Sequence, residues 1–280
     1  MRHDPGPRSG LAKLKGSGRR RRGAAAFTLL ELTVMLVVIG LLAGVLVVGT
    51  DLHRVAAVRM QARQLEQFNT AVAAFRLKFG GMPGDLRAEQ ASALGFEPRS
   101  GARGHGDGNQ LIEHCTADMG GLKVYGCEFT LFWSDLATAE MIPGQFAGTD
   151  AGADIQTAEA AFLYFPAAAL VTRGQLIVNT DADRLLPHWL SIMRILEMQP
   201  DGSSTSWSSP VIPADAEALD RKLDDGDPAG GSVHMLATPI LPGPFAPGLI
   251  GGPGLCTENG QYNLTVSEGV CQVNVGLSSQ

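Results

Sequence analysis

The chain has 280 residues, enough for one large domain or two modest ones with a buried core. Its formal charge of −6 is divided unevenly: residues 1–26 carry eight Lys or Arg against Asp4, a net +7, and the rest carries 14 Lys or Arg against 27 Asp or Glu, a net −13. A basic leader before an acidic body argues against nucleic-acid binding by the body and is typical of a leader retained in the cytoplasm.

The segment after the leader is apolar. From Phe27 to Val48 it contains one charge, Glu31, and no proline, which is about the length that a helix needs to span a bilayer. The helical pattern then continues, because apolar residues recur every three or four positions as far as Phe79. The residues of this stripe are Leu52, Val55, Val58, Ala62, Leu65, Phe68, Val72, Phe75 and Phe79.

Paired glycines and a proline in "GGMPG" (80–84) predict the end of this helix. We therefore expect one continuous helix from Phe27 to Phe79, about 80 Å long at 1.5 Å per residue. Residues 27–49 would form its membrane-spanning half, and residues 50–80 its amphipathic half.

Glu31 is a carboxylate placed where lipid is expected, which costs at least about 2.5 kcal/mol on insertion scales. It could lie shallow and reach the membrane surface. A cut between Ala26 and Phe27 offers another explanation, because it creates an α-amino group four residues before Glu31. Between staggered neighbouring helices, that amine and this carboxylate can pair and set the register of an assembly.

At these residues the chain resembles a known family. "FTLLELTVMLVVIGLLAG" is similar to the N-terminus of type IV pilins and type II secretion pseudopilins. The resemblance implies that prepilin peptidase cuts after Ala26 and methylates Phe27, and that Glu31 is required for assembly. The family usually has glycine before the cut, whereas this chain has Ala26, with Gly23 three residues earlier.

The remaining residues, 81–280, predict an α+β head. Residues 130–142 have helical spacing, residues 160–166 and 174–180 are typical of strands, and residues 212–231 contain a short helix opened by Pro213. Residues 262–276 predict a closing hairpin. "FGGMPGDL", "HGDGNQLIE", "FWSDLATAEMIPG" and "DRKLDDGDPAGG" resemble stretches of prepilin-type proteins, many of unassigned role.

Four cysteines, Cys115, Cys127, Cys256 and Cys271, follow the apolar segment without the close spacing of a zinc site. If the head is exported, disulfides are expected. Three pairings are possible, and we prefer the two between neighbours in sequence; buried free thiols in a cytosolic protein are the alternative. Cys256 and Cys271 also resemble the terminal disulfide loop of many pilins.

Two acidic loops offer oxygen ligands of the kind that calcium binds, although neither has the full EF-hand spacing. Solvated turns rich in Asp and Gly are the commoner explanation. The candidate ligands are Asp107 and Asn109 in the first loop and Asp224, Asp225 and Asp227 in the second. No other cofactor is expected, and no metalloprotease, hydrolase, P-loop or dinucleotide motif occurs, so we expect no enzyme.

We therefore expect a pilin-like α+β fold, with a long N-terminal helix packed on a head that contains antiparallel strands. The expected function is a structural subunit, a minor pilin or a pseudopilin, held in the bacterial inner membrane with its head periplasmic or extracellular until it enters a pilus or pseudopilus. Its partners would be prepilin peptidase, other subunits, the inner-membrane assembly platform and lipid, and nothing indicates nucleic acid for the head. The alternatives are a single-pass anchored binding protein that does not polymerise, and a secreted protein whose apolar segment is an ordinary signal.

Overall fold

The structure is a computed structural model that describes residues 28–115, 126–180, 188–200, 205–235 and 253–277. For residues 45–51, 205 and 253–254 it describes the backbone alone. The chain divides into two compact units, residues 1–49 and residues 50–280. The predicted cleavage site, Ala26 and Phe27, lies outside the described residues.

Helix α1 runs without a break over Leu29–Phe79. It ends where the glycines predict, because Gly80 takes a φ of +73° and its amide donates to the carbonyl of Arg76 at 2.8 Å. Most of the predicted stripe is buried in the head, whereas Leu52 and Val55 are exposed, so burial of the stripe begins later than predicted. The buried members are Val58, Ala62, Leu65, Phe68, Val72 and Phe75.

The head is built on an antiparallel sheet in the order β1-β2-β7-β4, with β3 also paired to β2. Its long central strand, β2, pairs with β1 and β3, which are its neighbours in the sequence, and with β7, which lies much later in the chain. The bounds are Gln175–Thr180 for β1, His188–Met198 for β2, Thr205–Ser208 for β3, Val233–Met235 for β4 and Val273–Gly276 for β7.

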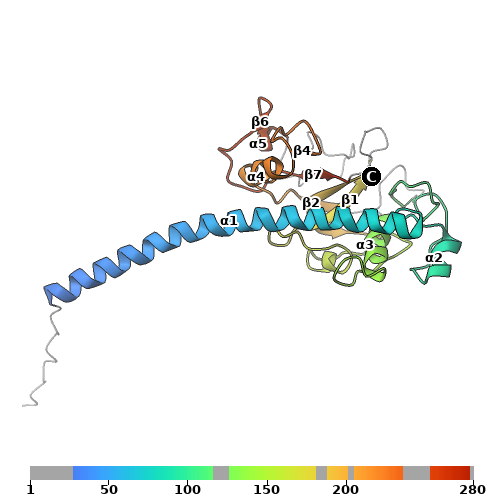
Figure 1. Cartoon of the computed structure of the whole chain (residues 1–280), viewed down its shortest axis with the longest axis horizontal. Coiled ribbons are helices and arrows are strands. Elements are labelled where there is room, and N and C mark those ends of the chain that lie inside the picture. The colour runs from blue at the N-terminus through green and yellow to red at the C-terminus, as the bar shows by residue number, and fades with distance from the viewer. Residues whose placement is uncertain (1–27, 116–125, 181–187, 201–204, 236–252, 278–280) are drawn as a thin grey trace, which may run out of the picture. The chain divides into compact units, whose positions relative to one another are not determined.

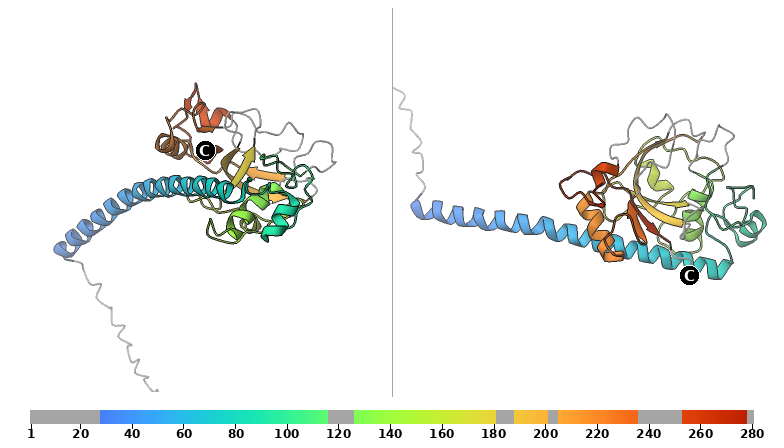
Figure 2. Two further views of the ribbon diagram at one scale, coloured as in Figure 1. Left: turned by 45° about the vertical axis from the view of Figure 1, so that its right-hand side comes forward. Right: turned by 90° about the horizontal axis from the view of Figure 1, so that it is seen from above.

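The register of the sheet separates an apolar row from a polar one, because side chains alternate between its faces. Val178, Leu190, Val275 and Val233 are aligned on one face, and all but Val275 are fully buried. These residues join the core cluster that contains the buried stripe of α1. The part of α1 after Thr50 therefore packs along the sheet in the second unit (Figures 1 and 2).

On the other face, a buried polar row crosses the sheet. Asn179 donates to the hydroxyl of Ser191 at 2.8 Å, and Ser191 donates to the side-chain oxygen of Asn274 at 2.5 Å. Three strands are thus linked through side chains as well as through their backbones, and each of these three buried polar side chains has a partner.

The other elements are α2 (Ala88–Leu94), α3 (Glu128–Thr138), α4 (Pro213–Leu223), α5 (Pro253–Cys256) and the β5–β6 pair (Thr257–Glu258 with Gln261–Tyr262). Helix α3 lies beside the end of α1 (Figure 1), with the rings of Phe68 and Trp133 5.1 Å apart. Helix α4 is joined to α1 by an ion pair between Asp215 and Arg54.

The predicted helices at 130–142 and 212–231 and the strand at 174–180 are confirmed as α3, α4 and β1. The strand predicted at 160–166 is wrong, because Ala160–Leu163 forms a 3₁₀ helix. A short apolar run does not distinguish a strand from a buried helical turn. The closing hairpin is also wrong: Gln261–Tyr262 pairs with Thr257–Glu258, while Val273–Gly276 pairs with β2 and β4.

Candidate functional site

The start of α1 places Glu31 in the first turn of the helix. The hydroxyl of Thr28 accepts a hydrogen bond from the amide of Glu31 at 3.1 Å, and the carbonyl of Thr28 accepts one from Leu32. Thr28 is therefore the N-cap, and Glu31 occupies the third helical position of a Thr-x-x-Glu capping pattern. Sequence reasoning missed this second role for Glu31, although the pattern was visible in "TLLE".

The first turns of α1 carry large apolar side chains around the whole helix, and these are exposed. They are Leu29, Leu30, Leu32, Val34, Met35, Leu36, Val37, Val38, Ile39, Leu41 and Leu42. Among the residues with described side chains, no helix combines the length and the apolar character needed to cross a membrane. The spanning half predicted at 27–49 includes Phe27 and side chains that lie outside this description, and it stays a prediction.

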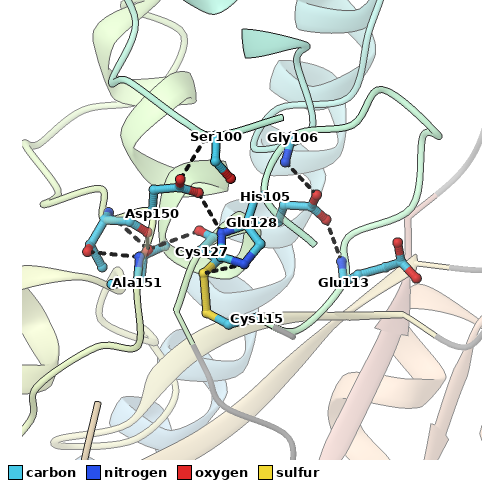
Figure 3. The surroundings of a disulfide bond; sticks show 11 residues. Ser100, His105, Gly106, Glu113, Cys115, Cys127, Glu128, Asp150 and Ala151 are labelled. Carbon is cyan, nitrogen blue, oxygen red and sulfur yellow. Dashed lines mark hydrogen bonds and ion pairs between the residues drawn. A yellow bond between two sulfur atoms is a disulfide. The ribbon is translucent and has the colours of Figure 1, made fainter. Parts of the chain in front are cut away.

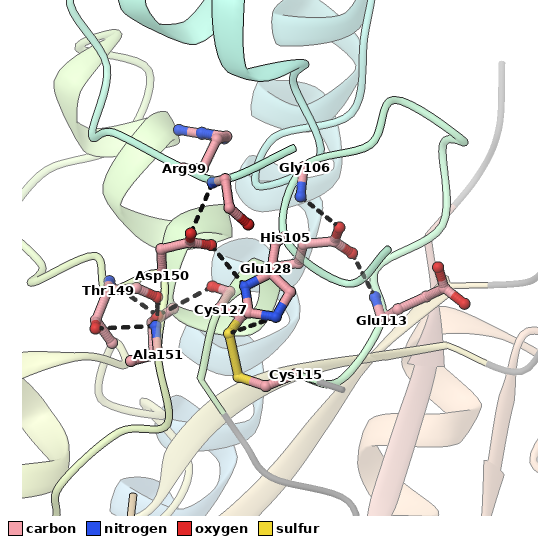
Figure 4. A network of polar contacts seen from close by, with 12 residues as sticks. Arg99, His105, Gly106, Glu113, Cys115, Cys127, Glu128, Thr149, Asp150 and Ala151 are labelled. Atoms are coloured by element: carbon pink, nitrogen blue, oxygen red, sulfur yellow. Dashed lines mark hydrogen bonds and ion pairs between the residues drawn. A yellow bond between two sulfur atoms is a disulfide. The ribbon is translucent and has the colours of Figure 1, made fainter. Parts of the chain in front are cut away.

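Two buried carboxylates in the head hold the glycine-rich loop around residue 107. Glu128, the first residue of α3, accepts hydrogen bonds from the amides of Gly106 at 2.8 Å and Glu113 at 2.6 Å (Figure 4). Asp85 accepts from the amides of Gly108 at 2.8 Å and Gln110 at 2.5 Å. The loop is thus fastened at four amides to acids that lie elsewhere in the sequence.

Burial dominates the electrostatics of these two acids. Removal from water raises the pKa of Glu128 to about 8 and that of Asp85 to about 6, while their amide donors oppose the increase. Asp107 adds a further negative charge, and carboxylate oxygens of all three residues lie within 4.8 Å of one another. At neutral pH, Glu128 is therefore mostly protonated.

A third acid, Asp135, forms a buried ion pair with Arg99. The two guanidinium nitrogens of Arg99 lie 3.0 and 2.7 Å from the carboxylate oxygens, and both side chains are fully buried. Gly84 completes the arrangement, since its amide donates to Asp135 at 2.7 Å and its carbonyl accepts from Arg99 at 3.2 Å. With a φ of +85° and the carbonyl of Glu128 2.5 Å from the place of a β-carbon, this position requires glycine.

Of the two candidate calcium ligands in the first loop, only Asp107 lies close to other acidic side chains. Asp107 joins the group with Asp85 and Glu128, both of which sequence reasoning missed because they come from other segments. Asn109 instead uses its side-chain amide to donate to Asp107 and Glu113. Three oxygens in reach of one another are fewer than the six to eight that calcium takes, so water or further groups would have to complete the shell.

The acids of the second predicted loop act mainly as acceptors for backbone amides. Asp224 accepts from Ser232 and Val233, Asp225 from Asp227, and Asp227 from Ala229. Asp224 and Asp225 also lie near Asp220, whereas Asp227 is not part of that group. These contacts favour the alternative of Asp-rich turns.

The structure contains the two disulfides between neighbours in sequence that we preferred, Cys115–Cys127 and Cys256–Cys271. The first lies beside a histidine and an aspartate (Figure 3). His105 places Nε2 3.9 Å from the sulfur of Cys127, and its Nδ1 lies 2.8 Å from Asp150. Sequence reasoning did not connect the disulfide Cys115–Cys127 with His105 and Asp150.

Comparison with known proteins adds no relative. No protein-family model, no curated protein and no solved structure matches the chain.

Proposed function

We propose that this protein is a structural, non-enzymatic subunit of a type IV filament system, a minor pilin or a pseudopilin, which is cleaved before Phe27 and assembles through α1. The observation that carries the proposal is the position of Glu31, one turn into an uninterrupted helix of 51 residues and four residues after the expected new terminus. The two disulfides support an exported head.

The chemistry of assembly follows from charge. A carboxylate in lipid is costly unless it is paired, and an unpaired buried charge is more costly than a paired one by several kcal/mol. The amine of a cleaved and methylated Phe27 remains cationic. A neighbouring subunit that presents this amine to Glu31 satisfies both charges at a single stagger, so the pair selects the register of the filament.

The Thr-x-x-Glu pattern offers a different explanation of the same glutamate, although the contact at Thr28 uses only the backbone amide of Glu31. In a capping pattern the third helical position accepts either Glu or Gln, because an uncharged oxygen also serves the helix start. Charge pairing requires the carboxylate. The two explanations therefore predict different outcomes for the Glu31→Gln variant: capping is retained, whereas charge pairing is lost.

The test compares three variants of the full chain in a host that carries the filament machinery. Glu31→Gln and Glu31→Ala should both lower the amount of subunit in sheared filaments by roughly tenfold or more, while membrane fractions keep the protein. Thr28→Ala, the matched control, loses about 1 kcal/mol of capping but keeps the charge and should still assemble. Normal assembly of Glu31→Gln would overturn the pairing and leave capping as the role of Glu31.

The mature N-terminus is the second measurement. Mass analysis should find a chain that begins with N-methylated Phe27. An uncut chain would instead support a membrane-anchored binding protein, and a start near Thr50 would support a secreted protein with an ordinary signal.

The partners and location follow from the proposed function. They are prepilin peptidase, other pilin or pseudopilin subunits, an inner-membrane assembly platform and the bilayer, with the head outside the cytoplasm.

A further inference from the structure

The disulfide Cys115–Cys127 lies beside polar side chains that a purely structural disulfide does not require. The imidazole of His105 contacts the sulfur of Cys127 through Nε2 and Asp150 through Nδ1, at 3.9 and 2.8 Å. Asp150 is in turn oriented by the amide of Ser100, which donates to its other oxygen at 2.7 Å (Figure 3). This series of carboxylate, imidazole and sulfur is the arrangement that activates cysteine nucleophiles.

The backbone adds a second electrostatic contribution at the same sulfur. Cys127 is the N-cap of α3, an 11-residue helix whose N-terminus carries the positive end of the helix dipole. The amide of Cys127 is held by the carbonyl of Ala151 at 3.0 Å, so the residue cannot easily move away from this position. Negative charge on the sulfur of Cys127 would therefore be stabilised by the helix and by a protonated His105.

The nearest acid on the same helix does not cancel this effect. Glu128 follows Cys127 directly, but burial raises its pKa to about 8, so it carries little negative charge at neutral pH. Its carboxyl group points to the amides of Gly106 and Glu113 (Figure 4).

The second disulfide provides the contrast. Among the described residues, no histidine hydrogen-bonds to a sulfur of Cys256–Cys271, and Cys256 ends a helix of only four residues. Both of its cysteines are buried, as are Cys115 and Cys127, with exposed fractions of 7% or less. The two disulfides therefore have similar burial and different electrostatic surroundings.

We propose that Cys115–Cys127 is a thiol–disulfide exchange site that accepts two electrons from the dithiol of a partner protein, with Cys127 as the leaving thiolate. This assignment goes beyond filament assembly and does not depend on it. Cys115 is the sulfur to be attacked, because the contact of His105 makes Cys127 the better leaving group, and residue Cys115 is the less deeply buried of the two.

The exchange proceeds in two steps. A thiolate of the dithiol attacks the sulfur of Cys115, which forms a mixed disulfide and breaks the bond to Cys127. The second thiolate of the dithiol then attacks the dithiol sulfur of the mixed disulfide, which forms the dithiol's own disulfide and releases Cys115 as a thiolate. The dithiol is oxidised to a disulfide, Cys115–Cys127 is reduced, and of the two protons that the dithiol gives up, one ends on Cys115 and the other on His105.

The test measures both disulfides in one sample. The full chain in detergent is incubated with dithiothreitol under native conditions, its free thiols are alkylated at intervals, and peptide mapping gives the opening rate of each disulfide. We expect Cys115–Cys127 to open about ten times faster than Cys256–Cys271, because a stabilised leaving thiolate departs faster. Comparable rates, or faster opening of Cys256–Cys271, would refute the proposal.

Two variants then test the histidine. His105→Gln keeps a side chain that can hydrogen-bond but cannot be protonated, and it should slow opening of Cys115–Cys127 by about tenfold. Asp150→Asn keeps the histidine but removes the carboxylate that orients it, and it should slow opening by a smaller factor. The rate at Cys256–Cys271 is the internal control for global unfolding and should stay constant. An unchanged opening rate in both variants would show that the contact is only structural.

Glutathione identifies the attacked sulfur. It has no second thiol of its own to resolve the mixed disulfide, so alkylation at early times, before Cys127 or another glutathione reacts, should trap the adduct on Cys115. A mixed disulfide on Cys127 would contradict the assignment of the leaving group.

Discussion

At the scale of single residues, the head depends on acids that are buried without a cation in direct contact. Glu128 and Asp85 each accept two amide hydrogen bonds, yet burial still raises the pKa of both. Burial raises the pKa of Asp135 as well, although Arg99 supplies a full positive charge at hydrogen-bond distance that opposes the increase. At all three acids, lost hydration therefore outweighs the hydrogen bonds that favour the charged form.

The raised pKa of Glu128 predicts stability that depends on pH. A carboxyl group with an ordinary value of 4.5 and a folded value of about 8 binds its proton more tightly in the folded state. Its contribution to the free energy of unfolding is complete below pH 4.5. It falls by about 1.4 kcal/mol for each pH unit above 4.5 and is lost as the pH rises through 8. Asp85 adds a smaller loss between 3.8 and about 6. Urea unfolding at pH 5 and pH 8.5 should show this decline.

Glu128→Gln tests the assignment. The variant loses one acceptor and should be less stable at pH 5, but its stability should change less between pH 5 and pH 8.5 than that of the wild type. Glu97→Gln, at an exposed glutamate, is the control and should keep the wild-type slope. If the stability of Glu128→Gln declines with pH as much as that of the wild type, another group causes the decline. If calcium bound at the candidate ligand Asp107, it would favour the ionised forms of Glu128 and Asp85 and reduce the loss of stability with rising pH in the wild type.

At the scale of elements, α1 is fastened to the head by polar contacts as well as by its apolar stripe. Gln61 is fully buried, and its oxygen accepts a hydrogen bond from the amide of Leu170 at 2.9 Å. Gln64 donates to the carbonyl of Ala167 at 2.8 Å and accepts from the amide of Ala169 at 3.0 Å. The two glutamines therefore hold the segment that leads into β1 against the helix.

Gln61→Leu should destabilise the head by about 1–3 kcal/mol, since it leaves the amide of Leu170 without its acceptor in a site of low water access. Gln67→Leu is the matched control, because Gln67 lies on the exposed side of the same helix and leucine has a similar helix propensity. Denaturant unfolding of both variants measures the difference. Equal losses in the two variants would mean that the contact at Leu170 contributes little.

At the scale of the whole molecule, the disulfide Cys256–Cys271 joins residues 15 apart near the end of the described chain. The amide of Cys271 donates to the carbonyl of Val211 at 2.9 Å, close to the start of α4. The covalent link therefore adds to contacts that already hold this region to the rest of the head. The disulfide is expected to stabilise the fold mainly by closing a loop in the unfolded chain, which lowers the conformational entropy of that state.

Replacing Cys256 and Cys271 together by serine should lower the free energy of unfolding by about 3 kcal/mol, the loop-closure value for this separation. Denaturant unfolding of the full chain in detergent measures it. A loss well below about 1 kcal/mol would indicate that the unfolded chain is already compact in this region.

The sequence by itself determined features that depend on neighbours along the chain. The three-to-four spacing of apolar residues predicts α1, Gly80 ends it, and Pro213 opens α4, because helices are set by contacts within one or two turns. The preference for neighbouring cysteines as disulfide partners also agrees with the structure.

Only the tertiary structure decided what lies together across long separations. The order of the sheet, the meeting of Asp85 and Glu128 around one loop, and the contact of His105 with Cys127 join residues from separate segments. Local spacing carries no information about such pairs, since their distance is set by packing of the whole head. For the same reason, the sequence suggested a local hairpin at residues 262–276, and the fold instead placed β7 between two distant strands.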